Sequence, residues 1–159
     1  MRRPSALRSL LARPVTEQLE APPSTGTGAA FAGSLQLRHV DAGSCNGCEL
    51  EIVSAFAPHY DAGRFGIRLV ASPRHADGVL VTGVVTRNMA EPLRKTLEAV
   101  PRPRVVVACG DCALNGGVFA GAYGVSSTLA EVAPPDVSIP GCPPSPVAIT
   151  EALRSLTGR

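Results

Sequence analysis

Two short apolar runs constrain the fold of this chain more than any other feature. Val79-Leu80-Val81 and Val105-Val106-Val107 are continuous, without the alternation between apolar and polar residues that marks a half-exposed strand. Strands covered on both faces have this pattern, and they are typical of parallel sheets with helices on each side. The sequence therefore predicts an α/β fold with a mainly parallel sheet flanked by helices.

Strand and helix patterns alternate along the chain from residue 35 onward. In open parallel sheets, ligands bind beyond the carboxyl ends of the strands, so a functional site is expected at that edge. The expected strands are residues 35–40, 67–71, 78–82 and 104–108, and the expected helices are residues 49–56, 89–100 and 148–156.

The first 34 residues differ from the rest of the chain. They carry the whole excess of positive charge, so the remaining part is neutral, and nucleic acid is not expected as the main partner. Residues 1–12 fit either a short basic amphipathic helix or an unstructured tail, and residues 21–34 fit a flexible linker of small residues. We expect an extended N-terminal segment over 1–34 and one folded domain over 35–159.

The cysteine count and the hydropathy pattern bear on the compartment. Five cysteines, an odd number, do not form a secreted disulfide framework, so a reducing, cytoplasmic setting is expected. The sequence has no run of 18 apolar residues, and therefore no segment is expected to cross a membrane by itself. A peripheral position on a membrane stays compatible with this pattern.

Four of the cysteines lie in three loops marked by glycine and proline. Cys45 and Cys48 share the first loop, Cys112 lies in the second, and Cys142 lies in a Pro-Gly-Cys-Pro-Pro turn. All three loops follow predicted strands or open helices, so the four sulfurs can point toward one object. Four thiolates are what a [4Fe–4S] cluster requires, and the sequence therefore predicts one such cluster.

Other chemistry remains open at this point. Two Cys-x2-Cys pairs, Cys45/Cys48 and Cys109/Cys112, also fit a zinc-binding structural module. Thioredoxin-like exchange at the first pair leaves Cys112 and Cys142 without a purpose. Cys109 ends a strand pattern and is interpreted as a small core residue rather than a ligand.

The glycine-rich second loop does not predict a nucleotide site. It lacks the Gly-Lys-Ser/Thr ending of a phosphate loop and the spacing of a dinucleotide-binding loop. Its glycines instead permit close approach of the backbone, whose N–H groups can donate to cluster sulfurs. Gly47, Gly116, Gly117 and Pro143 are therefore expected to lie against the cofactor.

Taken in order, five motifs resemble one known family. They are Cys-Asn-Gly-Cys-Glu-Leu-Glu-Ile, Ser-Pro-Arg-His-Ala-Asp, Val-Thr-Gly, Cys-Ala-x-x-Gly-Gly and Pro-Gly-Cys-Pro-Pro, between residues 45 and 144. They are similar to the complex I 20-kDa subunits and the small subunits of [NiFe] hydrogenases. The Cys-x-x-Cys spacing is most similar to the small subunits of energy-converting hydrogenases of the formate hydrogenlyase type. The resemblance implies a flavodoxin-like domain.

The resemblance also implies a function. Cys45, Cys48, Cys112 and Cys142 would bind one [4Fe–4S] cluster, and the chain would relay electrons to or from a large partner subunit of the hydrogenase type. The [NiFe] centre would lie in that partner, and other iron–sulfur and membrane subunits would hold the complex on the cytoplasmic face of the inner membrane. The alternative is a quinone reductase module of the NADH-quinone oxidoreductase type, beside a complex I 49-kDa-type subunit.

Several polar residues are candidates on weaker patterns. Glu49 and Glu51 lie in a first helical turn, where carboxylates favour the helix dipole; the resemblance adds a proton-relay role, better suited to Glu51. Arg74 and His75 are candidates for a subunit interface or the cluster surroundings. His39 and His59 are interpreted as ordinary fold or surface residues, and Asp111 as a turn residue.

Overall fold

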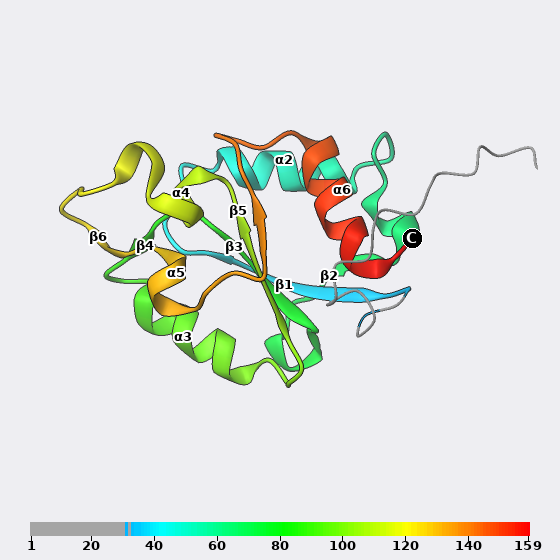
Figure 1. The fold of residues 1–159 in the computed structure, drawn as a ribbon, viewed down its shortest axis with the longest axis horizontal. Coiled ribbons are helices and arrows are strands. Elements are labelled where there is room, and N and C mark those ends of the chain that lie inside the picture. Colours follow the sequence, from blue (N-terminus) through cyan, green and yellow to red (C-terminus); the bar gives the residue numbers. More distant parts are fainter. Residues whose placement is uncertain (1–30, 32) are drawn as a thin grey trace, which may run out of the picture.

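The computed structural model of the chain describes residue 31 and residues 33–159 (Figure 1). The helix predicted for residues 1–12 and most of the linker predicted for 21–34 lie outside the described residues. Phe31 packs into the core, and the Gly33 N–H donates a hydrogen bond to the Thr157 carbonyl at 2.9 Å. The division into an N-terminal segment and a domain from residue 35 stays a prediction.

A five-stranded sheet forms the centre of the domain, and every pair of neighbouring strands in it is parallel. The strand order is β2-β1-β3-β5-β7, which is the flavodoxin-like order, with the direction of winding reversing between β1 and β3. The predicted α/β, flavodoxin-like fold class is confirmed. The strands are β1 (Leu35–Asp41), β2 (Ile67–Leu69), β3 (Gly78–Thr82), β5 (Val105–Cys109) and β7 (Val137–Ile139).

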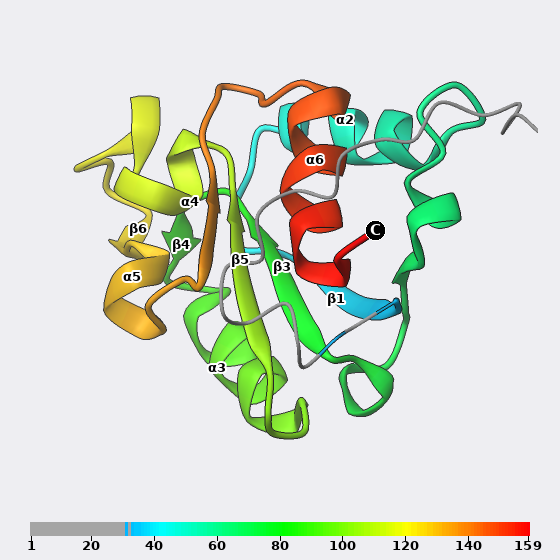
Figure 2. The ribbon, with the colours of Figure 1, turned by 45° about the vertical axis from the view of Figure 1, so that its right-hand side comes forward.

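Helices cover both faces of this sheet. Figures 1 and 2 show α2 (Gly47–Phe56) beside α6 (Pro146–Thr157) on one face and α3 (Ala90–Ala99) on the other. Two short helices, α4 (Asp111–Asn115) and α5 (Leu129–Val132), join the α3 side. Among the described residues, no helix combines the length and the apolar character needed to span a bilayer.

The core consists of two layers separated by the sheet, as the continuous apolar runs predict. Along β5, Val105, Val107 and Cys109 pack on the side of α2 and α6, whereas Val106 and Ala108 pack on the side of α3. All five residues of β3 are buried as well. Alternate side chains thus face opposite layers, and neither face of the central strands meets water.

Several short elements were absent from the sequence-based prediction. They are α4, α5, β7, the small antiparallel sheet of β4 (Val85–Thr86) with β6 (Val125–Ser127), and three 3-10 turns, Ala62–Phe65, Pro73–His75 and Gly117–Phe119. None exceeds five residues, which is too short for a helical or alternating pattern to stand out. β2 is also shorter than predicted, since it ends at Leu69 rather than Ala71.

Leu153 on α6 tests the importance of the layer beneath α2 and α6. Its side chain is fully buried, whereas Leu50 on α2 is 62% exposed. Leu153→Ala should lower the free energy of unfolding by about 2–5 kcal/mol, because it leaves a cavity in the core. Leu50→Ala should change it by less than about 0.5 kcal/mol. Urea unfolding followed by circular dichroism measures both, and equal losses would contradict the described packing.

Candidate metal centre

Three loops leave the carboxyl ends of parallel strands and carry the four cysteines predicted as ligands. The loop after β1 leads into α2 with Cys45 and Cys48, β5 leads into α4 with Cys112, and β7 leads toward α6 with Cys142. Because the strands are parallel, these loops lie at the same edge of the sheet. The structure therefore places the four cysteines at the edge where the sequence predicted a site.

Backbone hydrogen bonds join the second and third loops. The Gly110 N–H donates to the Ile139 carbonyl at 2.8 Å, and the Asp111 N–H donates to the Gly141 carbonyl at 2.9 Å. In return, the Gly141 N–H donates to Asp111 Oδ1 at 2.8 Å. Asp111, interpreted from the sequence as a turn residue, thus connects the loop of Cys112 to the loop of Cys142.

Glycines lie directly against three of the sulfurs. A Cβ added at Gly110 would meet Cys48 Sγ at 2.6 Å, and one at Gly117 would meet Cys112 Sγ at 3.0 Å. A Cβ at Gly47 would meet Cys45 Sγ at 3.5 Å and the ring of Pro143 at 3.8 Å. The missing side chains therefore leave room around the sulfurs for backbone approach.

Not every residue predicted to bind the cofactor lies near the cysteine sulfurs. Gly47, Gly117 and Pro143 lie among the cysteine loops, whereas the nearest atoms to a Cβ at Gly116 belong to Ala120. Gly116 instead ends α4 in the left-handed region, at φ +88°. Sequence reasoning did not include Gly110, although its position between a buried strand and Cys112 could have indicated it.

The four cysteines differ in exposure and influence one another. Cys45 and Cys142 are exposed, whereas Cys48 and Cys112 are buried. The pKa of the Cys112 thiol is raised, first because the side chain is buried and then because nearby cysteine sulfurs add negative charge. Those sulfurs belong to Cys142, Cys48 and Cys45, in decreasing order of effect.

The fifth cysteine lies in the same buried layer as one of the four. The neighbouring Cys109 thiol is the main cause that lowers the pKa of Cys48, and Cys48 together with burial raises the pKa of Cys109. Cys109 is fully buried at the end of β5. Its burial agrees with its interpretation as a small core residue.

The donor set of this edge fits an iron–sulfur cluster. Its candidate ligands are thiols, which as thiolates are the ligands of [4Fe–4S] clusters. In the described part of the chain, no three His, Cys, Asp or Glu side chains are close enough to surround a single metal ion. A cluster of four irons takes one thiolate on each iron, so its ligands lie farther apart than those of one ion. The glycines beside three of the sulfurs let the backbone lie close to them.

Glu49 fixes the first cysteine loop to the sheet. Its Oε2 accepts a hydrogen bond from the Ser44 hydroxyl at 2.7 Å, and its Oε1 accepts one from the Thr82 hydroxyl at the end of β3. The Asp41 carboxylate accepts two further hydrogen bonds at 2.8 Å, from the N–H groups of Gly43 and Ser44. These contacts hold the chain on both sides of Cys45.

His39 extends this polar network along the sheet. Its Nε2 lies 2.9 Å from Thr82 Oγ1 and 3.7 Å from Glu49 Oε1. Because the single hydroxyl hydrogen of Thr82 goes to Glu49, Nε2 must carry the hydrogen that His39 shares with Thr82. Burial lowers the pKa of His39, and the negative charge of Glu49 opposes that shift only in part. His39 is therefore a residue of the fold, which is one of the two roles that the sequence left open for it.

Two other predicted groups lie elsewhere. Glu51 is half-buried on α2, two residues beyond Glu49 and so on a different side of the helix. Arg74 and His75 form a 3-10 turn before β3, at the opposite edge of the sheet from the cysteine loops. The structure therefore does not bring Arg74 and His75 into the surroundings of the cysteines.

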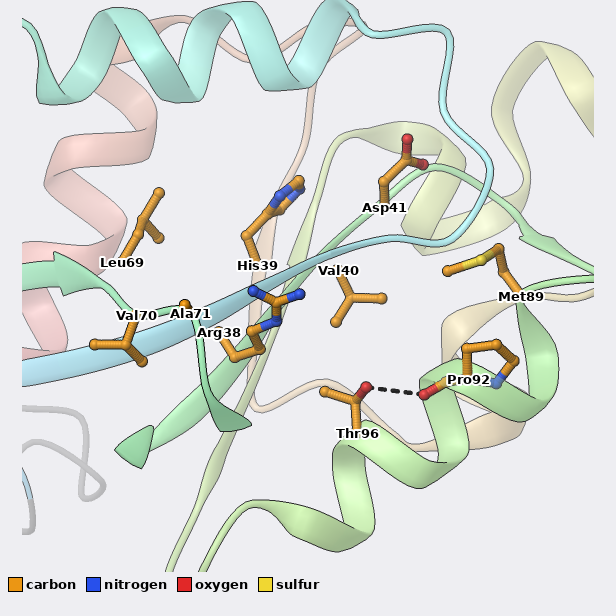
Figure 3. A pocket seen from close by; sticks show the side chains of 10 residues that line it. All are labelled: Arg38, His39, Val40, Asp41, Leu69, Val70, Ala71, Met89, Pro92 and Thr96. Atoms are coloured by element: carbon orange, nitrogen blue, oxygen red, sulfur yellow. Dashed lines mark hydrogen bonds between the residues drawn. The ribbon is translucent and has the colours of Figure 1, made fainter. Parts of the chain in front are cut away.

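A pocket of about 620 Å³ opens beside the exposed part of β1 (Figure 3). β2 pairs with β1 only as far as Leu37, so the edge of residues 38–41 is free on that side. His39 and Asp41 lie on one side of β1, and Arg38 and Val40 on the other. The pocket thus reaches His39 and Asp41 of the polar network, and none of the cysteines lines it.

The fold and this edge define a class of protein, a flavodoxin-like domain with four cysteines in the loops at one end of its sheet. Residues 45–156 match the NADH ubiquinone oxidoreductase 20 Kd subunit family, and the chain belongs to that family. The family resemblance predicted from the five motifs is thereby confirmed.

Relatives within this family are subunits of oxidoreductase complexes. A probable membrane-bound hydrogenase subunit of Pyrococcus furiosus is 50% identical over 72% of this chain and 69% of its own length. Formate hydrogenlyase subunit 7 of Escherichia coli is 46% identical over 72% of this chain. The present chain spans only 45% of the length of that second relative.

A solved structure is similar as well. A chain of the membrane-bound sulfane sulfur reductase, an archaeal respiratory membrane complex, has a TM-score of 0.70 at 35% identity. The similarity covers 82% of this chain and 72% of that chain. The comparisons therefore support an oxidoreductase subunit, as the motifs predicted.

His39→Gln tests the polar network through its pH dependence. The pKa of His39 in the folded protein lies below 6.5, so the unfolded chain binds the proton first as the pH falls. The stability that depends on neutral His39 is complete above pH 6.5 and is lost below it. The free energy of unfolding should therefore fall more in the wild type than in His39→Gln between about pH 7.5 and 5.5. Equal falls in urea titrations would refute this assignment.

Proposed function

We propose that Cys45, Cys48, Cys112 and Cys142 bind one [4Fe–4S] cluster, and that this chain is the electron-transfer subunit of a hydrogenase-type complex. The observation that carries the proposal is the meeting of three cysteine loops at one sheet edge, with glycines against three of the sulfurs. When bound, such a cluster supplies one-electron transfer at a potential that the surrounding protein adjusts. The folded domain over 35–159 is proposed as the unit that binds it.

The chain's own residues support this role by holding the thiols in place. The hydrogen bonds between Asp111 and Gly141 fix Cys112 relative to Cys142. The contacts of Glu49 with Ser44 and Thr82 fix the first loop on β3. These hydrogen bonds join loops that follow three different strands, so the four thiols are positioned before the cofactor binds. Less conformational entropy is then lost on binding.

Exposed apolar side chains on the same elements suggest where a partner subunit docks. Leu50 and Val53 are 62% and 68% exposed on α2, just beyond Cys48, and Val118 is 77% exposed just beyond Cys112. Large apolar side chains that gather near a functional site often mark a protein interface. We place the large, hydrogenase-type subunit on this face, beside the exposed Cys45 and Cys142.

The named relatives guide the choice of complex. Their names mention a membrane-bound hydrogenase and formate hydrogenlyase, which supports a [NiFe] centre in the partner subunit. The family name supports the alternative, a quinone reductase module beside a complex I 49-kDa-type subunit. In either complex, we propose a peripheral position on the cytoplasmic face of the inner membrane, reached through further iron–sulfur and membrane subunits.

Glu51 is the proposed proton-relay residue. Both carboxylate oxygens of Glu49 already accept hydrogen bonds from hydroxyl groups, which suits an anchoring role better than proton transfer. Glu51 is half-buried on the same helix and next to Leu50, on the proposed partner side. This assignment keeps the two glutamates in separate roles.

Metal analysis of the chain purified without oxygen tests the proposed cofactor. The protein should be brown, contain about four irons and four sulfides per chain, and show an EPR signal after reduction. Cys112→Ser should lose this iron, whereas Cys109→Ser, the same change at another buried cysteine, should keep it. A colourless protein with one zinc ion per chain would refute the proposal in favour of a zinc-binding structural module.

Gly110→Ala tests whether the glycines make room for the ligand sulfurs. The new Cβ would lie 2.6 Å from Cys48 Sγ and must displace it, so most of the iron should be lost. Gly121→Ala is the control, because Gly121 also has a positive φ but has no atom within 4 Å of the added Cβ. Iron content is compared after circular dichroism verifies both folds. Full iron in Gly110→Ala would show that this close approach is unimportant.

A further inference from the structure

The outer edge of β1 lacks a strand neighbour over its last residues. β2 pairs with β1 only from Leu35 to Leu37, and the Val70 N–H donates a final hydrogen bond to the Leu37 carbonyl at 2.9 Å. The chain then enters the 3-10 turn of Pro73–His75. Among the described residues, 38–41 of β1 therefore pair with β3 on one side and with no strand on the other.

The alternation of backbone groups along β1 shows which of them point to this open side. Neighbouring residues of a central strand direct their N–H and C=O groups to opposite sides. Leu37 directs its carbonyl toward β2, since it accepts the hydrogen bond from Val70. His39 and Asp41 follow in the same alternation, so their N–H and C=O groups point to the side where β2 has ended. Such an edge is a template for another strand.

The pocket of about 620 Å³ lies along this edge (Figure 3). His39 and Leu69 line it on the side of α2, and Arg38 and Met89 line it on the side of α3. The crossover from β2 to β3 contains only a 3-10 turn of three residues, in place of the helix that usually connects parallel strands. The pocket therefore has room for an extended segment whose side chains alternate between the two faces.

The α3 face of this edge carries positive charge. Arg38 lies on that face, because its neighbour in register is Val79, which packs on the α3 side. Arg68 shares the face, since it pairs with Gln36, two residues before Arg38. In the part of the chain that the structure describes, neither guanidinium group forms an ion pair. The Asp41 carboxylate lies on the opposite face and accepts two backbone hydrogen bonds.

These charges distinguish between the possible occupants of the edge. A second copy of the chain would bring another Arg38 to the same face rather than a carboxylate. Residues 1–30 carry four arginines against two glutamates, so this segment is basic as well. A partner with a carboxylate opposite Arg38 is complementary instead, because cross-strand pairs of opposite charge stabilise a sheet and like charges destabilise it.

We propose that residues 38–41 of β1 bind an extended acidic segment of a partner subunit, which adds a sixth strand to the sheet. The N–H and C=O groups of His39 and Asp41 hydrogen-bond the backbone of that segment, and Arg38 pairs with its carboxylate. Leu50, Val53 and Val118, which mark the proposed face for the large subunit, do not line this pocket. Binding at this edge requires no cluster on the cysteines.

Hydrogen exchange of single amides in the full-length chain tests the edge, with mass spectrometry and electron-transfer fragmentation as the readout. In the chain alone, the His39 and Asp41 amides should exchange fast, whereas the Arg38 and Val40 amides, which face β3, should exchange slowly. The probe is the capped peptide Thr-Val-Glu-Val-Thr. At about ten times its Kd, exchange at His39 and Asp41 alone should slow by about tenfold.

Isothermal titration calorimetry with a second peptide, Thr-Val-Lys-Val-Thr, tests the charge. The wild type should bind the glutamate peptide about tenfold more tightly than the lysine peptide. Arg38→Glu should reverse this preference. Arg102→Glu, the same change at an exposed arginine before β5, should keep it. Circular dichroism verifies that both variants are folded.

The same measurements can contradict the proposal. Slow exchange at His39 and Asp41 in the chain alone would overturn it, because the edge would already be covered by residues 1–30 or by a second copy. Absence of binding by the glutamate peptide, or equal affinity of the wild type for both peptides, would overturn it as well. The iron content of the chain tests the proposed cluster separately, so the two proposals can fail independently.

Discussion

The reciprocal pair of hydrogen bonds between Asp111 and Gly141 is the contact on which the candidate site depends most. It continues the parallel pairing of β5 and β7 beyond the ends of both strands and carries it into the loops of Cys112 and Cys142. Together with the Gly110–Ile139 backbone hydrogen bond, it joins two loops that are separated by 30 residues in the sequence. One bond of the pair joins backbone groups and the other is accepted by the Asp111 side chain, so the sheet and this carboxylate together position the two loops.

Glu49 positions the first cysteine loop through hydrogen bonds between side chains. Its two carboxylate oxygens join Ser44 in the loop to Thr82 on β3, and Thr82 in turn contacts His39 on β1. The first loop is therefore bound to β3, and the second and third loops are bound to each other beyond the ends of β5 and β7. Buried Cys48 and Cys112 lie toward the core, and exposed Cys45 and Cys142 face outward. The proposed site thus has two cysteines shielded from solvent and two that a partner subunit could reach.

The sequence predicts the parts of this arrangement that show a pattern within one short segment of the chain. β3 and β5 were predicted closely, because uninterrupted apolar runs identify strands covered on both faces. The four loop cysteines stand out through their glycine and proline neighbours. By contrast, β7 spans only three residues, and the contacts of Asp111 and Glu49 join residues far apart in the chain. Such contacts follow from strand order and register, which composition and spacing do not specify.

Crystallography with iron anomalous scattering, on protein purified and crystallised without oxygen, would locate the bound metal. We expect a single group of four iron atoms at the carboxyl edge of the sheet, each bound to one sulfur from Cys45, Cys48, Cys112 or Cys142. A single anomalous peak at the zinc edge, or iron bound to Cys109 in place of one of these four, would contradict it.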